Sequence, residues 1–354
     1  MDLSFYKGKK VFVTGHTGFK GAWLSKVLLD AGAEITGYSR YSKKEASLYE
    51  LLGIDGDING IRGDVRDFQS LNAAVNEAKP DIILHLAAQP IVRESYADPR
   101  GTYETNVMGT VNILESARLC ESVKSLVNVT TDKVYRNREW AWGYRENDEL
   151  NGFDPYSNSK SCSELVTQCY MRSFFDGADI GISTARAGNV IGGGDFAKDR
   201  IIPDCIRAAL KNETITVRNP YSTRPYQFVL EPVCAYLMIA MKQYSDAAYA
   251  GHYNIGPDEC DCVSTGRLAD LFCSYWGSGA AWKSVCEKGV HEANFLKLDC
   301  SRIKAKYGWA PVWHIDDAVK KTVEWTKCLA DGGDVRQITE RQIKEYLSAG
   351  EKRI

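Results

Sequence analysis

A tyrosine and a lysine stand four residues apart at Tyr156 and Lys160. On a helix this spacing places both side chains on one face, where they can act together. A phenol with a pKa of about 10 is a weak base at neutral pH, but a nearby ammonium group stabilises its phenolate form. Such a pair can accept a proton from a substrate hydroxyl group. The spacing is common by chance, so it indicates a site only if other reactive groups face it.

The stretch from Thr130 to Lys133 supplies a second set of reactive groups. It ends an apolar run that predicts a strand. The carboxyl group of Asp132 and the amine of Lys133 are suited to moving protons, and Thr131 adds a hydroxyl group. Ligands of parallel sheets bind beyond the carboxyl ends of the strands, so these groups can face the same cleft as the tyrosine. An exposed ion-pairing turn is the alternative interpretation.

Three glycines recur with the spacing G-x-x-G-x-x-G between the first predicted strand and the first helical pattern. Glycine allows a tight turn and lets a phosphate group approach the backbone, and a helix N-terminus offers free N–H groups. The arrangement predicts a dinucleotide site, and a merely tight turn is the alternative. The residues predicted to bind the cofactor here are Gly15, Thr17, Gly18, Phe19, Lys20 and Gly21.

Residues after three other predicted strands complete this dinucleotide site. The second strand ends before Ser39 and Arg40, where an acidic residue would bind the ribose 2′-hydroxyl of NAD. Because this acid is missing, Ser39 and Arg40 favour the 2′-phosphate of NADP. The alternative is that Arg40 is a solvated surface residue. Asp64 and Val65 are placed at the adenine edge. Small side chains near the end of the fourth strand permit close approach, which adds Leu86, Ala87, Ala88 and Gln89.

Strand-like and helix-like segments alternate through the first half of the chain. Apolar runs predict strands at 9–14, 34–38, 81–87, 125–130 and 180–186, and helical patterns lie at 22–29, 70–78, 105–121 and 157–175. The sequence therefore predicts an α/β protein, with a Rossmann-type doubly wound parallel sheet and a smaller C-terminal substrate-binding lobe. We expect the dinucleotide-binding domain at 1–190, with returning segments from about 225–257, and the lobe at 191–354.

The composition of the 354 residues is that of an ordinary globular protein, with 44% hydrophobic and 25% charged residues. A net charge of −2 provides no basic field for nucleic acid or for an anionic membrane surface. No apolar run reaches the roughly 18 residues that span a bilayer, so a cytoplasmic location is expected. The 11 cysteines lack the paired spacing of a zinc site, and we expect no metal.

Taken together, the motifs resemble a known family. The glycine turn, the threonine-bearing strand end and the tyrosine–lysine helix are similar to those of extended short-chain dehydrogenase/reductases that modify nucleotide sugars. Within these, the resemblance is to the CDP-glucose 4,6-dehydratases. It rests on the segments 15–21, 131–133, 142–147, 154–160, 186–195 and 229–232, and it extends to 297–301 and 308–309. The resemblance covers nearly the whole chain in long blocks, which makes it specific.

The aspartate–lysine pair distinguishes subgroups of this family. Most sugar-nucleotide 4,6-dehydratases carry aspartate followed by glutamate at this point, the CDP-glucose enzymes carry aspartate followed by lysine, and epimerases of the fold lack such a pair. The resemblance implies that Tyr156, beside Thr131, removes the proton of the sugar C4 hydroxyl. It implies Lys133 as the base at C5 and Asp132 as the acid for the departing C6 hydroxyl. Lys160 would hold the nicotinamide ribose.

The resemblance also implies the ligands. The cofactor is a tightly bound NAD, regenerated in each cycle, against the NADP interpretation of Ser39 and Arg40, and its site gains Asn106, Thr130, Tyr156 and Lys160. The substrate is the nucleotide sugar CDP-glucose, used in deoxysugar biosynthesis for lipopolysaccharide O-antigen. Guanidinium groups suit its two phosphates, although each arginine alone is more often a surface residue. The predicted substrate-binding residues are Gln89, Arg186, Asn189, Arg218, Arg224, Gln227, Glu231 and Arg302.

Assembly and two alternative functions follow as expectations. The resemblance implies a homodimer or homotetramer formed through the helices at 105–121 and 157–175. Another nucleotide-sugar 4,6-dehydratase, or a 4-epimerase or 4-reductase of the same family, is the enzymatic alternative. The non-enzymatic alternative is a dinucleotide-sensing regulator that kept the fold and lost the catalytic activity. The intact Thr131, Tyr156 and Lys160 argue against this alternative.

Overall fold

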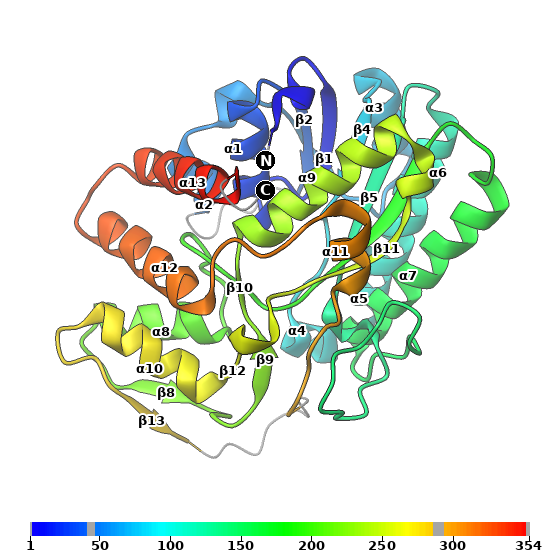
Figure 1. Ribbon diagram of the computed structural model, residues 1–354. Coiled ribbons are helices and arrows are strands. Elements are labelled where there is room, and N and C mark those ends of the chain that lie inside the picture. The colour runs from blue at the N-terminus through cyan, green and yellow to red at the C-terminus, as the bar shows by residue number, and fades with distance from the viewer. Residues whose placement is uncertain (1, 41–46, 286–293, 352–354) are drawn as a thin grey trace.

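The structure is a computed structural model that describes residues 2–40, 47–285 and 294–351. Its centre is a parallel sheet of seven strands in the order β11-β6-β5-β4-β1-β2-β3 (Figure 1). The strands are β1 (Lys10–Thr14), β2 (Glu34–Ser39), β3 (Asn59–Arg62), β4 (Ile82–His85), β5 (Ser125–Thr131), β6 (Gly181–Ala187) and β11 (Gly251–Ile255). The strand order runs outward from β1 in both directions, which confirms the predicted doubly wound Rossmann-type sheet.

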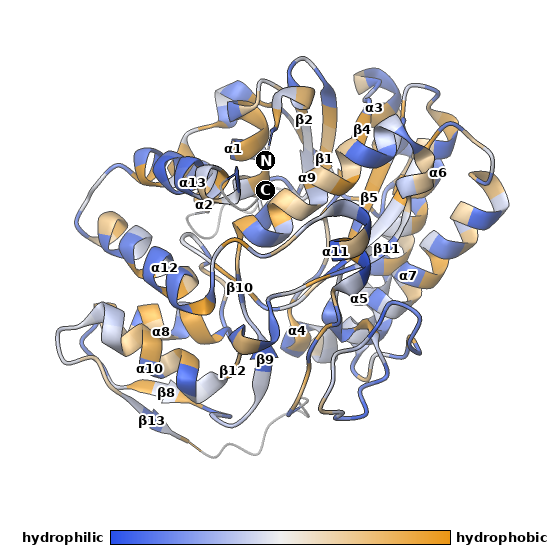
Figure 2. Cartoon of the chain, viewed as in Figure 1, coloured by the Kyte–Doolittle hydropathy of each residue, from blue (hydrophilic) through white to orange (hydrophobic). Residues whose placement is uncertain are grey.

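The inner strands are buried on both of their faces. In β1, Val11 and Val13 join one hydrophobic core, whereas Phe12 joins a second core on the opposite face. Every residue of β4, β5 and β6 is buried. Figure 2 shows hydrophobic colouring on the sheet and on α9 (Leu230–Ser245), and mostly hydrophilic colouring on the outer helix α13 (Val335–Glu351). Burial on both faces explains why the strands are near-continuous apolar runs in the sequence.

Two helix layers cover the sheet (Figure 1). α1 (Phe19–Asp30) and α9 pack on one face, whereas α3 (Phe68–Ala78), α6 (Gly109–Leu119) and α7 (Pro155–Phe174) pack on the other. The predicted helix 105–121 starts as a π-helix, Glu104–Met108, and continues as α6. The connections after β2 and β4 contain α2 (Leu48–Leu52), α4 (Val92–Ala97) and α5 (Pro99–Tyr103). In the described ranges, no helix combines the length and the apolar character that a membrane crossing requires.

A smaller lobe lies beside the sheet and is built from later parts of the chain (Figure 1). Its elements are β7 (Val190–Ile191), α8 (Ile201–Leu210), β8 (Ile215–Val217), β9 (Thr223–Pro225), β10 (Gln227–Phe228), β12 (Cys262–Ser264), α10 (Thr265–Trp276), β13 (Trp282–Ser284) and α12 (Ile315–Ala330). Other late segments return to the sheet: β11 pairs with β6, α11 (Ser301–Tyr307) packs on β11, and α13 packs on α2. Residues after 190 are therefore shared between the sheet and the lobe.

Candidate active site

A cleft of about 520 Å³ lies between the carboxyl ends of the sheet strands and the smaller lobe. The predicted site residues that line it are Gly15, Thr17, Gly18, Phe19, Lys20, Gly21, Ser39, Arg40, Asp64, Val65, Leu86, Ala87, Ala88, Thr130, Thr131, Asp132, Lys133, Tyr156, Asn189, Arg218 and Arg224. Those that do not line it are Gln89, Asn106, Lys160, Arg186, Gln227, Glu231 and Arg302. The structure thus gathers the glycine turn, the strand end after β5 and the start of α7 around one space.

Close backbone contacts explain the glycines between β1 and α1. Gly15 has a φ of +75°, and a Cβ atom there would lie 2.8 Å from the backbone nitrogen of Ala87. A Cβ atom on Gly21 would lie 2.1 Å from the carbonyl oxygen of Gly15. Gly18 is the N-cap of α1 and provides no side-chain cap, so the first N–H groups of this helix lie at the cleft. These N–H groups suit a pyrophosphate, so the turn fits a dinucleotide.

Ser39 ends β2, Arg40 follows it, and both already have protein partners. The Ser39 hydroxyl lies 2.9 Å from His16 Nδ1, and Arg40 Nη1 lies 3.8 Å from an Asp64 carboxylate oxygen. Asp64 also receives three hydrogen bonds from the Arg66 guanidinium group, the shortest at 2.7 Å. The charge of Arg40 is therefore partly balanced by a carboxylate. This contact weakens the argument for a 2′-phosphate at this position.

The start of α7 places the tyrosine and the lysine one turn apart. Pro155 occupies the first turn, and the Asp154 carboxylate accepts a hydrogen bond from the backbone nitrogen of Ser157 at 2.9 Å. A proline in the first turn and an acidic N-cap are both favourable at a helix start. Because the start of the helix is fixed in this way, Tyr156 reaches the cleft while Lys160 lies beneath it.

Burial shifts the proton affinities of both residues. It raises the pKa of Tyr156 to about 12, and a hydrogen bond with the Thr131 hydroxyl acts in the opposite direction. Burial also lowers the pKa of Lys160 to about 7, and the nearby charge of Lys20 adds to this effect. The Lys160 amine donates to the carbonyl oxygen of Val129 at 3.1 Å. Both shifts favour neutral groups, so Tyr156 needs further positive charge in the cleft to act as a base at neutral pH.

Asp132 and Lys133 begin a short 3-10 turn, Asp132–Val134, directly after β5. Asp132 is buried, and its Oδ1 accepts a hydrogen bond from the Thr131 hydroxyl at 2.9 Å. Its buried Oδ2 has no hydrogen-bond partner within the described part of the chain. Burial raises the pKa of Asp132, whereas the charge of Lys133 acts against that shift. A carboxyl group in this state can hold a proton and offer it to a leaving hydroxyl group.

Arg186 lies in the core and does not reach the cleft, contrary to its predicted role as a phosphate ligand. Its guanidinium group forms an ion pair with Glu164 at 2.8 Å, and both side chains are 0% exposed. It also donates to the Tyr135 hydroxyl at 2.8 Å and to the Glu146 carbonyl oxygen at 3.0 Å. The reason for the difference is that Arg186 points from β6 toward the buried carboxylate of α7, where it serves as a structural cation.

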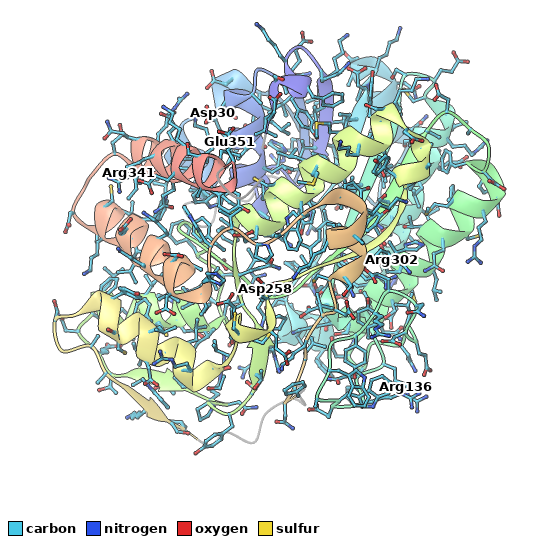
Figure 3. All side chains as sticks on the ribbon, viewed as in Figure 1. Asp30, Arg136, Asp258, Arg302, Arg341 and Glu351 are labelled. Carbon is cyan, nitrogen blue, oxygen red and sulfur yellow. The ribbon has the colours of Figure 1, made fainter. Side chains whose placement is uncertain are left out.

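Three other predicted substrate ligands bind parts of the fold instead. Gln227 donates to a carbonyl oxygen of β11 at 2.9 Å. Glu231 accepts hydrogen bonds from the backbone nitrogens of 312–313 at 3.0 and 2.7 Å, which fastens the chain before α12. Arg302 lies on α11, 3.7 Å from the carboxylate of Glu146 (Figure 3). These partners are distant in sequence, so no local pattern could reveal them.

Gln89 and Asn106 bind each other behind the cleft. The Gln89 backbone nitrogen donates to Asn106 Oδ1 at 2.8 Å, and Asn106 Nδ2 donates to the Gln89 carbonyl oxygen at 3.1 Å. Asn106 Nδ2 also donates to the hydroxyl of Ser159, the residue before Lys160 on α7, at 2.9 Å. The two residues therefore position the loop after β4 against the helix that carries the tyrosine and the lysine.

We expect Arg186→Met to destabilise the protein strongly. The change removes the guanidinium partner of the buried Glu164 carboxylate and leaves it only the Thr130 and Thr184 hydroxyls and His252. Loss of one partner of a buried ion pair costs roughly 3–5 kcal/mol of unfolding free energy. Denaturant unfolding measures this loss. The matched control is Arg302→Met, which removes an arginine that is 46% exposed and should change the unfolding free energy by less than about 0.5 kcal/mol. An unchanged unfolding free energy for Arg186→Met, together with a raised KM, would restore Arg186 as a phosphate ligand.

The cleft also contains charged residues that sequence reasoning missed. Arg200 pairs with Asp195 at 2.9 Å, and Arg93 pairs with Asp199 at 3.3 Å. All four line the cleft. The charged run from 195 to 200 is the available signal, but charged loops are usually solvated, so the run alone does not indicate a site.

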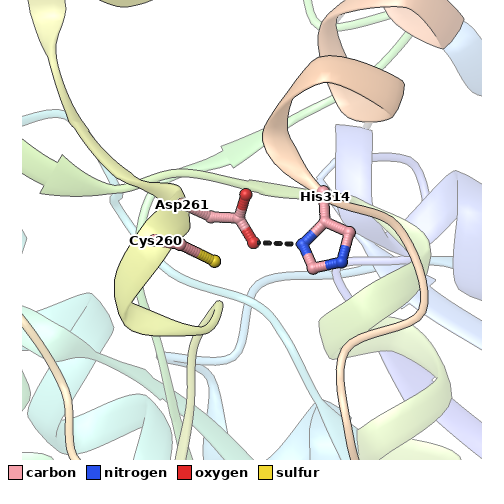
Figure 4. Close-up of side chains that lie close together, drawn as sticks. All are labelled: Cys260, Asp261 and His314. Atoms are coloured by element: carbon pink, nitrogen blue, oxygen red, sulfur yellow. Dashed lines mark hydrogen bonds and ion pairs between the residues drawn. The ribbon is translucent and has the colours of Figure 1, made fainter.

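A cluster of possible metal-ligating groups lies outside the cleft, where the 3-10 turn Glu259–Asp261 meets the start of α12 (Figure 4). Atoms of Cys260, Asp261 and His314 lie within 4.8 Å of one another, and this is the only such group of three among the described residues. Asp261 Oδ2 is 2.7 Å from His314 Nδ1, and Oδ1 accepts from the backbone nitrogen of Ile315 at 3.0 Å. Both carboxylate oxygens of Asp261 thus bind the start of α12. These contacts explain why the three side chains lie close together without a bound ion.

Comparison with known proteins shows the family to which the chain belongs. Residues 12–322 match the family model described as GDP-mannose 4,6 dehydratase, and the chain belongs to this family. Among its relatives, the CDP-glucose 4,6-dehydratase of Salmonella typhimurium is 45% identical over 99% of both chains. A probable dTDP-glucose 4,6-dehydratase of Sinorhizobium fredii is 26% identical, covering 89% of this chain and 92% of the relative.

Solved structures of two kinds of enzyme share the fold. The dTDP-glucose 4,6-dehydratase of Bacillus anthracis, in complex with NAD, has a TM-score of 0.77 at 20% identity and covers 90% of this chain and 96% of that chain. The UDP-glucose 4-epimerase of Thermus thermophilus, also with NAD, has a TM-score of 0.78 at 22% identity and covers 90% and 98%. Because the fold is common to dehydratases and epimerases, the residues in the cleft and not the fold determine the reaction.

Proposed function

We propose that this protein is a CDP-glucose 4,6-dehydratase, a hydro-lyase that converts CDP-D-glucose to CDP-4-dehydro-6-deoxy-D-glucose and water. One observation carries the proposal: a phenol, a buried carboxyl group and an amine, from Tyr156, Asp132 and Lys133, line one cleft beside a dinucleotide-type turn. The relative at 45% identity supports the choice of cytidine nucleotide and sugar. The product is a precursor for deoxysugar biosynthesis.

NAD is the proposed cofactor, regenerated in each cycle. Gly15–Gly21 would hold its pyrophosphate, Asp64 and Val65 would lie at the adenine edge, and the small side chains of Ala87 and Ala88 would permit close approach. A bound nicotinamide supplies the hydride acceptor for C4 and the hydride donor for C6. The contact between Arg40 and Asp64 supports NAD over NADP, because that carboxylate would repel a 2′-phosphate.

The first step is removal of the proton from the C4 hydroxyl group, with Tyr156 as the base. Thr131 hydrogen-bonds to the same phenol and can hold the C4 oxygen beside it. Lys160, one turn along α7, is the cation of the protein that stabilises the phenolate when protonated. The three residues therefore deprotonate and orient the sugar at the carbon that is oxidised.

The second step is water elimination across C5 and C6. The new C4 ketone acidifies the neighbouring C5 proton, and Lys133 accepts that proton. Asp132, whose pKa is raised by burial, donates a proton to the departing C6 hydroxyl from Oδ2, which has no hydrogen-bond partner among the described residues. A base and an acid at adjacent positions act on adjacent carbons, which a simple C4 epimerisation does not require.

For the diphosphate of the substrate we propose Asn189, Arg218 and Arg224, which line the lobe side of the cleft. A guanidinium fork matches phosphate oxygens and donates charge-assisted hydrogen bonds. Arg224 is buried, so a phosphate bound there would be shielded from water. Such local cations are needed because the protein as a whole carries a net charge of −2.

Self-association as a homodimer or homotetramer is also proposed. Met108, Leu119, Leu165 and Phe174, on the π-helix, α6 and α7, each expose about half of their surface. α6 and α7 pack side by side, so their outer faces can form one apolar surface. Exposed apolar patches of this kind are typical of protein interfaces.

A substrate panel of CDP-, UDP-, GDP- and dTDP-glucose separates the candidate functions. We expect CDP-glucose to be converted at least about 100-fold more efficiently than the others, to a product lighter by one water that absorbs near-ultraviolet light in alkali. An epimer of unchanged mass would show a 4-epimerase, and dependence on added NADPH a reductase. Conversion of another nucleotide would indicate a different 4,6-dehydratase. NAD binding without turnover would indicate the dinucleotide-sensing regulator.

A further inference from the structure

One carboxylate in the cleft holds two arginines that come from opposite walls. Asp199 Oδ1 lies 3.3 Å from Arg93 Nη1 and 3.0 Å from Arg218 Nη1. Arg93 belongs to α4, which follows β4 of the sheet, whereas Arg218 directly follows β8 of the lobe. All three side chains line the cleft and remain partly exposed. Asp199 therefore connects the two walls across the space that a substrate must enter.

The backbone at Asp199 adopts an uncommon conformation. Its φ is +62°, in the left-handed region that residues other than glycine rarely occupy. The residue lies in the loop between β7 and α8, with no strand or helix to hold it there. The two ion pairs help to hold Asp199 in this conformation, so releasing its carboxylate also lets the loop relax.

Two further ion pairs lie on the lobe side of the cleft. Arg200 pairs with Asp195 at 2.9 Å, and Arg218 Nη2 lies 3.6 Å from an oxygen of Asp204. A nucleotide diphosphate brings at least two negative charges into this set. A carboxylate that gives up its cation favours binding of the diphosphate, because like charges at contact distance repel. Asp199 is the acid whose departure removes a carboxylate contact from two guanidinium groups at once, those of Arg93 and Arg218.

We propose that Asp199 is an internal substitute for the substrate diphosphate. It holds Arg93 and Arg218 until a nucleotide sugar binds, and the phosphate oxygens then take over both guanidinium groups. Arg93 is thereby a substrate ligand, and Asp199 is a competitor of the substrate. The inference rests on the proposed nucleotide-sugar substrate. It adds Arg93 as a ligand of the diphosphate and Asp199 as the group that the diphosphate displaces.

The test is calorimetric binding of CDP, inorganic pyrophosphate and cytidine to the NAD-loaded protein. Asp199→Asn keeps the side-chain size and removes the charge, and it should bind CDP and pyrophosphate about 3- to 10-fold more tightly. Arg93→Gln should bind both about 10-fold more weakly. Cytidine has no phosphate, so its binding should not change. The control Asp57→Asn removes a distant carboxylate, paired with Arg336 at 3.4 Å, and should leave all three affinities unchanged.

Weaker or unchanged binding of CDP and pyrophosphate by Asp199→Asn would overturn the inference. In the Arg93→Gln background, the gain from Asp199→Asn should fall by at least about half, because one of the two freed cations is already absent. An undiminished gain in affinity would contradict the proposal that Arg93 and Arg218 share the Asp199 carboxylate. Failure of the proposed function can be distinguished from failure of this inference. A protein that prefers UDP or GDP to CDP would still show the effect of Asp199→Asn on the binding of pyrophosphate.

Discussion

Lys133→Ala should lower the conversion of CDP-glucose to the 4-keto-6-deoxy product by about 1,000-fold, in keeping with loss of a general base. The amine is the group that removes the C5 proton, and no elimination can follow without that step. Oxidation at C4 does not involve Lys133, so reduced nicotinamide should accumulate in the variant after mixing with substrate. Product mass and near-ultraviolet absorbance measure the two effects separately.

The matched control for this variant is Lys320→Ala, which removes an exposed lysine of α12. Its turnover should equal that of the unchanged protein, and the affinity for NAD should be the same in both variants. If Lys133→Ala turned over normally, the assignment of Lys133 as the C5 base would be wrong. A large loss of NAD affinity would instead show that Lys133 binds the cofactor.

Tyr156→Phe should lower the turnover of CDP-glucose by about 10,000-fold, at the upper end of the contribution of a general base. The phenol oxygen is the group that accepts the C4 proton, and hydride transfer cannot proceed from a protonated hydroxyl. The reaction therefore stops before the first redox step. Stopped-flow absorbance should show no reduced nicotinamide, in contrast to Lys133→Ala.

Tyr275→Phe is the matched control, because the Tyr275 hydroxyl lies on α10 and donates only to Asp316 at 3.5 Å among its described hydrogen bonds. It should be fully active. Rapid formation of reduced nicotinamide in Tyr156→Phe would show that another group removes the C4 proton. The contrast between the Tyr156 and Lys133 variants thus orders the two steps.

The sheet could be predicted because its strands are buried on both faces. A run such as 82–84 has continuous apolar character only where helices cover both sides, and the helical segments between the runs supply that cover. The π-helix at 104–108 could not be predicted, because it keeps the apolar pattern of the α-helix that follows it. The division of the later chain between sheet and lobe depended on long-range pairing, as in β11 with β6.

The candidate site was predictable where its residues follow strand ends and less so where they are arginines. Thr131, Asp132 and Lys133 are placed by β5 itself. Arg186 also lies near the end of a strand, yet its side chain points into the core, because its partner Glu164 lies on a different element. The same guanidinium group suits a phosphate and a buried carboxylate, so residue type alone does not separate the two roles.

The most direct test of the proposed reaction uses CDP-glucose that carries deuterium at both C4 and C5. We expect a product that has lost one water, with the C4 deuterium at C6 and a solvent hydrogen at C5. The reason is that the hydride that leaves C4 returns to C6, whereas the C5 proton passes to Lys133 and exchanges with water. Mass spectrometry and NMR of the product locate both hydrogens. A 4-epimer that keeps its mass, or a dehydrated product without deuterium at C6, would contradict the proposed reaction.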